Sequence, residues 1–191
     1  TQAGKLNITG ENNINIGYQA GYSNVSGNNN VNIGAQAGLN SITSNNIFIG
    51  ALTGKNNTDG QNNILIGSSA GESNQSGQNN IFMGTNAGKN LLTDNNIAIG
   101  TQAGNNSQNT YAISIGYKAG ETAQGSSTIA IGRGAGQTIQ KNEAVAIGYL
   151  AGNSNQNSSA IAIGSSAGQS LQNTNTIANG TDAGTTSQNA Y

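Results

Sequence analysis

The chain has 191 residues, of which only 7% are charged, and six Lys or Arg against seven Asp or Glu give a net charge of −1. It contains no His, Cys, Pro or Trp, which removes the imidazole base, the thiolate nucleophile, the His/Cys zinc site and the disulfide. The balanced charge does not favour nucleic acid or an anionic membrane surface, and no apolar run is long enough to span a bilayer. We therefore expect a protein that is not an enzyme, with no cofactor, no metal, no nucleic-acid partner and no direct membrane contact.

Two glycines recur along the whole chain at intervals of 16 or 17 residues. The second follows the first by four residues, as Gly21 follows Gly17. Such a fixed period is typical of repeat architectures and is not required of a disordered segment. The first glycine of each repeat is Gly17, Gly34, Gly50, Gly67, Gly84, Gly100, Gly116, Gly132, Gly148, Gly164 or Gly180.

Each first glycine is preceded by an aliphatic, a variable and an aliphatic residue, as in residues 47–49 and 145–147. Residues 177–179 depart from this pattern at Asn179. A spacing of two with β-branched side chains predicts a short strand, whereas a helix needs a period of 3.6. One strand per repeat cannot bury its own face, so neighbouring repeats must stack. The sequence predicts an all-β, parallel β-solenoid of about twelve coils of 16–17 residues, forming a single array over residues 1–191.

The repeat also indicates what fills the coils. We expect the paired aliphatic residues to stack in the interior. The Ala before the second glycine, such as Ala20 and Ala37, should fill a narrower corner, where only Thr53 departs from Ala. The residue before each aliphatic triplet is Asn in the first half of the chain and Ala or Thr in the second half. In the first half we therefore expect an asparagine ladder bonded through side-chain amides. Its members are Asn13, Asn30, Asn46, Asn63, Asn80 and Asn96.

The residue between the paired aliphatics should point away from the interior, because successive side chains of a strand face opposite sides. Eight of these residues form a candidate interface for other copies of the chain, or a docking patch, and small apolar side chains there favour a homotrimer with parallel chains. The alternative is that Ala simply fits a crowded strand. The candidates are Phe48, Leu65, Phe82, Ala98, Ala130, Ala146, Ala162 and Ala178.

Three tyrosines directly follow a first glycine: Tyr18, Tyr117 and Tyr149. We expect them to be exposed and to be candidate contacts for a host surface protein or glycan. The alternative is that they are ordinary surface tyrosines without a partner.

Two repeats, Val145-Ala146-Ile147-Gly148 and Ile161-Ala162-Ile163-Gly164, resemble the head repeats of YadA-type trimeric autotransporter adhesins. The resemblance implies a left-handed parallel β-roll, three rolls about one axis, and attachment to matrix proteins or cells. Glu143 and Ala144 stand where that family has Asn and Ser, and Ala151 stands where it has a further Ser. Similar Asn-rich repeats occur in phage and giant-virus fibre proteins, which leaves a viral tail or capsid fibre as the alternative.

Residues 1–4 repeat residues 101–104, and residues 187–191 resemble residues 107–111, so both ends fall inside a repeat. We expect an internal segment of a longer fibre chain. Together with the resemblance, this predicts a structural and adhesive fibre that is extracellular, on a cell surface or on a virion surface, and that mediates attachment to host or neighbouring cells.

Overall fold

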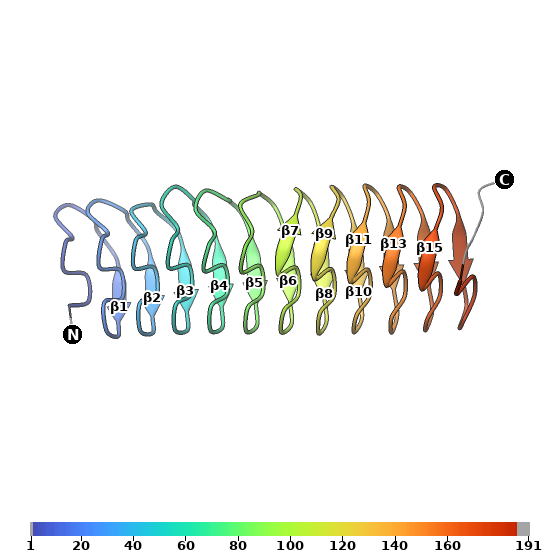
Figure 1. Cartoon of the computed structure of the whole chain (residues 1–191). Coiled ribbons are helices and arrows are strands. Elements are labelled where there is room, and N and C mark those ends of the chain that lie inside the picture. Colours follow the sequence, from blue (N-terminus) through green and yellow to red (C-terminus); the bar gives the residue numbers. More distant parts are fainter. Residues whose placement is uncertain (1, 187–191) are drawn as a thin grey trace. The chain divides into compact units, whose positions relative to one another are not determined.

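The computed structural model describes residues 2–186, and Figure 1 labels their strands. The chain divides into two compact units, Thr1–Asn95 and Asn96–Tyr191. Strands, turns and loops make up both units, and residues 2–186 contain no helix. Each unit is a parallel β-solenoid, which confirms the predicted fold class. The similarity of residues 187–191 to residues 107–111 lies outside the described residues.

In the first unit, each coil contributes one three-residue strand at the predicted triplet. Equivalent residues of successive coils pair in parallel, so that Ile14 pairs with Val31 and Ile16 with Ile33. The strands are β1 (Ile14–Ile16), β2 (Val31–Ile33), β3 (Ile47–Ile49), β4 (Ile64–Ile66) and β5 (Ile81–Met83).

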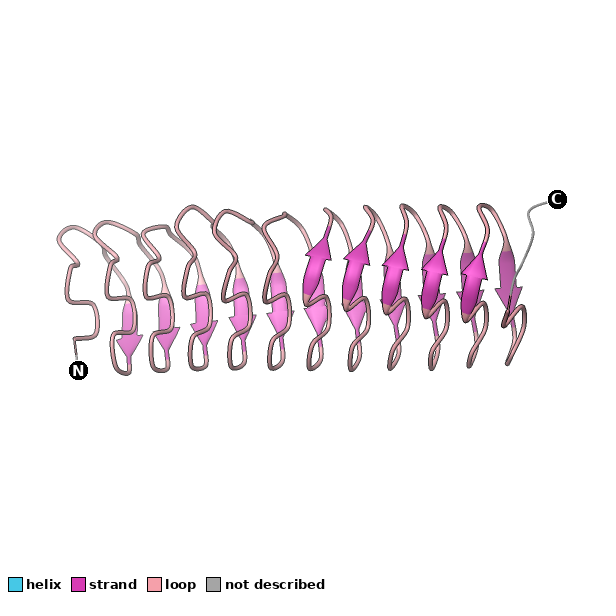
Figure 2. Ribbon diagram, in the orientation of Figure 1, coloured by secondary structure: helices cyan, strands magenta, loops and turns pink. Residues whose placement is uncertain are grey.

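In the second unit, most coils carry two strands, which form two parallel sheets (Figure 2). The first sheet comprises β6 (Ile97–Ile99), β8 (Ile113–Ile115), β10 (Ile129–Ile131), β12 (Val145–Ile147), β14 (Ile161–Ile163) and β16 (Ile177–Asn179). The second comprises β7 (Asn106–Gln108), β9 (Thr122–Gln124), β11 (Thr138–Gln140), β13 (Ser154–Gln156) and β15 (Ser170–Gln172). The sequence pattern predicts one strand per coil, and the second sheet departs from that prediction.

In each strand triplet, the side chains expected inside the coil lie outside it, and the side chain expected outside lies inside. The alternation of side chains is as predicted, but the middle residue lies inside the coil and the paired aliphatics lie outside. The eight candidate interface residues are therefore interior residues, and the prediction that they contact another chain is wrong. Phe48, Leu65, Phe82, Ala98, Ala130, Ala146 and Ala162 are fully buried, and Ala178 is 1% exposed.

The reason for this reversal is the narrowness of the coil. A Cβ atom added to Gly88 would lie 2.5 Å from the ring of Phe82, and one added to Gly152 would lie 3.2 Å from the Cβ atom of Ala146. The backbone at the second glycine thus lies very close to the inward-facing middle residue of the strand. The interior of a coil therefore has room for one inward-facing side chain from the strand, but not for two branched aliphatic side chains.

Two other expectations about the interior are confirmed. The alanines before the second glycines are fully buried from Ala20 to Ala167, whereas Ala3 is exposed and Ala183 is partly buried. The asparagine ladder also forms, although mostly through bonds between side chain and backbone. Asn46 donates its backbone N–H to Oδ1 of Asn30 at 2.9 Å, and Asn63 donates its Nδ2 to the carbonyl of Gly77 at 2.9 Å.

A glutamine ladder in the second unit was not foreseen. Nε2 of Gln140 donates to Oε1 of Gln156 at 3.0 Å and to the carbonyl of Ala144 at 3.0 Å. Nε2 of Gln156 donates in the same way to Gln172 and to Ala160, both at 3.0 Å. Ala144 and Ala160 occupy the position that holds Asn in the first unit, so Gln side chains from the second sheet supply the amides there. All of Gln108, Gln124, Gln140, Gln156 and Gln172 are buried.

The second sheet places one residue of each of its strands in the left-handed region. In β11 this residue is Ile139, with φ of 53°, and in β13 it is Asn155, with φ of 55°. Asn tolerates this conformation, whereas a β-branched residue is strained in it. Ile139 is also 40% exposed, so burial of the rest of its side chain, worth about 1 kcal/mol, offsets only part of a strain of about 1–3 kcal/mol.

We predict that Ile139→Asn raises the free energy of unfolding by about 1 kcal/mol, because it relieves this strain. The reciprocal change, Asn155→Ile, should lower that free energy by a similar amount. Urea unfolding followed by circular dichroism measures both. A loss of stability in the Ile139→Asn variant would contradict the assigned backbone conformation.

We also predict that Gln156→Leu lowers the free energy of unfolding by about 1–3 kcal/mol, because buried carbonyls and the amide oxygen of Gln172 lose their donor. Gln169→Leu is the matched control, because it changes a half-buried glutamine outside the ladder. It should change the free energy of unfolding by less than about 0.5 kcal/mol. Equal effects of the two substitutions in the same unfolding assay would argue against the ladder.

Candidate functional site

The paired aliphatic side chains form an outward-facing apolar surface on each unit, which we name the aliphatic face. It consists of the first and third residues of the strands β1–β6, β8, β10, β12, β14 and β16, and Asn179 is its one polar member. None of these residues is charged. The most exposed aliphatic members are Ile14, Ile16, Ile64, Met83, Ile147, Ile163 and Ile177, and the others are half-buried.

The aliphatic face differs from the scattered exposed hydrophobic residues that every protein carries. Its members pair in register from coil to coil, as Val145 does with Ile161 and Ile147 does with Ile163. Neighbouring rungs are about 4.8 Å apart. Within each unit the side chains therefore form continuous apolar rows, and such contiguous exposed surface typically marks an interaction site. This surface, and not the row of buried middle residues, is the one available to another chain.

The three candidate tyrosines are exposed, as predicted: Tyr18 by 57%, Tyr117 by 47% and Tyr149 by 48%. Tyr117 and Tyr149 are brought together around Arg133, which follows the first glycine of the coil between theirs. Tyr18 has no such neighbour, because Ala35 takes the equivalent position in the next coil.

Arg133 lies between two aromatic rings. Its guanidinium carbon is 5.8 Å from the ring centroid of Tyr117 and 5.6 Å from that of Tyr149. The ammonium of Lys118 lies 5.8 Å from the ring centroid of Tyr117 as well. These distances are within the range of cation–π attraction. The side chains of three successive coils thus form one ordered aromatic and cationic cluster.

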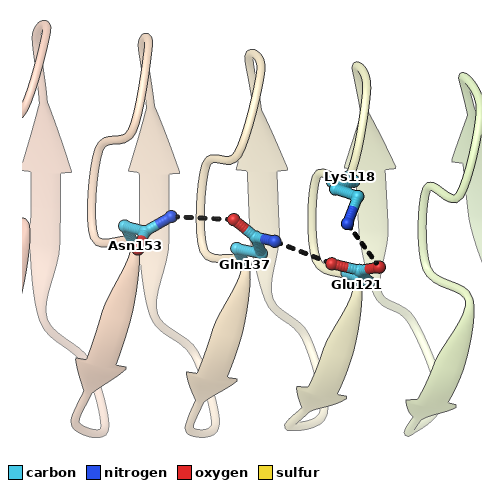
Figure 3. A network of polar contacts seen from close by, with 4 residues as sticks. All are labelled: Lys118, Glu121, Gln137 and Asn153. Carbon is cyan, nitrogen blue, oxygen red and sulfur yellow. Dashed lines mark hydrogen bonds and ion pairs between the residues drawn. The ribbon is translucent and has the colours of Figure 1, made fainter.

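A polar network runs beside this cluster (Figure 3). Lys118 Nζ is 3.3 Å from Glu121 Oε1, and Gln137 Nε2 donates to Glu121 Oε2 at 2.7 Å. Asn153 Nδ2 donates both to Gln137 Oε1 at 3.1 Å and to the carbonyl of Gly134 at 2.8 Å. The second of these bonds joins the network to the turn that carries Arg133.

Sequence reasoning missed Arg133 and the network, although a signal was present. Glu121, Gln137 and Asn153 each directly follow the second glycine of their coil, so the repeat alone places them in one row. In the first unit, the residues that follow the second glycines include an ion pair between Lys89 Nζ and Glu72 Oε2 at 3.3 Å. At several of these equivalent positions, side chains therefore interact from one coil to the next.

No group of three or more His, Cys, Asp or Glu that could hold a metal ion occurs in the part of the chain that the structure describes. Nor does that part contain a helix long and apolar enough to cross a membrane. Comparisons with models of protein families, with curated proteins and with solved structures give no match for this chain.

Proposed function

We propose that this chain is a non-catalytic fibre protein of a cell surface, that it assembles as a parallel homotrimer, and that it attaches its owner to host or neighbouring cells. The observation that carries this proposal is the aliphatic face. A β-solenoid is compatible with a fibre, and a fibre with a continuous apolar surface needs a partner to cover that surface.

A second copy of the chain is the partner that fits best. The aliphatic face is uncharged and repeats at the spacing of the coils, so a covering surface must offer apolar side chains with the same spacing. A parallel copy in register does so at every rung. Burial of a half-exposed Ile stabilises an assembly by on the order of 1 kcal/mol, and each coil offers two such positions. Identical copies that meet in this way close into a cyclic oligomer.

The number of chains and the adhesive role are supported by the resemblance to YadA-type heads. In the repeats that carry it, Val145 and Ile147 lie on the aliphatic face, whereas Ala146 lies inside the coil. Three rolls about one axis would bury three aliphatic faces against one another. The remaining polar surfaces would then present the same contacts three times, which strengthens weak individual contacts through multivalency.

We predict that the double variant Ile147→Glu and Ile163→Glu releases single folded chains, because it places charges in the apolar contact between copies. Light scattering should report three chains for the parent protein and one for the variant, while circular dichroism stays unchanged. A parent protein that is monomeric would overturn the assembly proposal.

Two further variants separate assembly from folding. Leu171→Glu alters an exposed apolar residue outside the aliphatic face, so the protein should remain trimeric. Ala146→Glu introduces a charge into the coil interior, so it should reduce the unfolding midpoint before it affects association. Dissociation of folded chains by Ala146→Glu would place the contact on the wrong side of the strand.

Adhesion is tested with fluorescent beads that carry the trimeric protein. We predict that these beads bind to cultured host cells or to bacterial cells more than beads coated with albumin do, and that soluble trimer competes for the binding. Flow cytometry measures the bound fraction. Equal binding of the two kinds of bead to every cell type would remove the adhesive role and leave the proposed fibre assembly standing.

A further inference from the structure

We infer that Tyr117, Arg133 and Tyr149 form a binding site for the carboxylate of an acidic sugar, such as a uronic or sialic acid in a surface glycan. The inference rests on the proposed adhesive function, for which it names the class of ligand. It is carried by the position, charge and surroundings of Arg133.

The guanidinium of Arg133 is held in place but has no polar partner. The two rings lie 5.8 and 5.6 Å from its central carbon, so the side chain is ordered before any ligand arrives. The ion pairs in residues 2–186 join Lys118 to Glu121 and Lys89 to Glu72, and neither includes Arg133. The guanidinium also forms no hydrogen bond within the described chain, and Arg133 is exposed. Its N–H donors therefore remain available.

The one carboxylate of the network, that of Glu121, does not compete for this cation. Glu121 already accepts from Lys118 at 3.3 Å and from Gln137 at 2.7 Å, with both of its oxygens engaged. The cations Lys118 and Arg133 against the single anion Glu121 leave a charge of +1 on this surface, in a chain whose net charge is −1. The cluster thus attracts an anion.

The shape of the cluster favours a carboxylate. A guanidinium presents parallel N–H groups that match the two oxygens of a carboxylate, and an ordered guanidinium loses less conformational entropy on binding than a free one. The phenol groups of the flanking tyrosines add hydroxyl donors and apolar edges on both sides. Tyr117 and Tyr149 are two coils apart, which is about 10 Å, so one ring flanks the guanidinium on each side.

The surroundings favour a sugar over an acidic peptide. The amides of Gln137 and Asn153 lie in a row beside the cluster, and the bond from Asn153 to the carbonyl of Gly134 ties that row to the Arg133 turn. The second N–H of the Gln137 amide has no bond within the described chain and can donate to a sugar hydroxyl, and an apolar pocket for peptide side chains is not part of this arrangement. An acidic peptide is therefore treated as a competing outcome.

The test is titration calorimetry of the full chain with two acidic probes and their neutral counterparts. The uronate arm compares oligogalacturonate with its methyl ester, and the sialate arm compares sialyllactose with lactose. We expect at least one acidic probe to bind, its neutral counterpart to bind at least about tenfold more weakly, and the affinity to fall as salt is raised. Binding by neither acidic probe, or equal affinity for the neutral forms, would overturn the inference. Hexaglutamate that binds more tightly than both acidic sugars would overturn the choice of a glycan.

Variants assign the binding to the cluster. Arg133→Gln should weaken binding of the acidic probe at least about tenfold, and Arg133→Lys should weaken it less, because it keeps the charge but loses the paired donors. Tyr149→Ala should also weaken binding, whereas Tyr18→Ala is the matched control at the same position of another coil and should not. Unchanged affinity of Arg133→Gln would refute the site.

The bead assay separates this inference from the adhesive function. Beads that carry Arg133→Gln should bind fewer cells than beads with the parent protein. If they bind equally well, the adhesive role stands and the assigned ligand class falls. If the parent beads bind no cells while the acidic probe still binds in solution, the sugar site stands and the adhesive role falls.

Discussion

Close stacking of equivalent residues is the constraint on which the rest of this structure depends. Each coil pairs with the next through parallel backbone hydrogen bonds, so every position repeats at the spacing of a β-ladder. The first glycines make that approach possible: a Cβ atom on Gly116 would lie 2.7 Å from the carbonyl oxygen of Gly132. The second glycines narrow each coil from the opposite wall. A narrow interior then admits one side chain from each strand and leaves the branched aliphatics outside.

The two units solve the same problem of polar groups in this interior with different amides. Backbone groups at the turns need partners once they are buried. In the first unit, short Asn side chains satisfy them from the equivalent position of the neighbouring coil, as when Asn30 Oδ1 accepts from the N–H of Asn46. In the second unit, the longer Gln side chains reach across from the second sheet, so Ala144 can replace Asn. The change in the sequence pattern near Asn96 is thus a change in which wall of the coil supplies the amide.

The repeat, the strand positions and the asparagine ladder could be predicted because they depend on spacing, and spacing is written in the sequence. Spacing could not show which side chains of a strand face the interior, because the side chains alternate in the same way whichever face is buried. Hydrophobicity favoured Ile147 inside and Ala146 outside, and only the volume of the coil reverses that choice. The second sheet was missed because Gln140 and its equivalents look like surface residues, although their period of 16 was visible.

The same vertical register explains why surface chemistry in this chain works in rows. A side chain at one position always has the equivalent position of the next coil about 4.8 Å away. A substitution in one coil changes a single side chain. Substitutions at the same position of consecutive coils create a cluster of neighbouring side chains. Tyr117, Arg133 and Tyr149 are the clearest case, because a cation between two rings exists only when three successive coils carry these residues in this order. A stacked repeat can therefore change its surface chemistry without any change to the narrow interior that defines its fold.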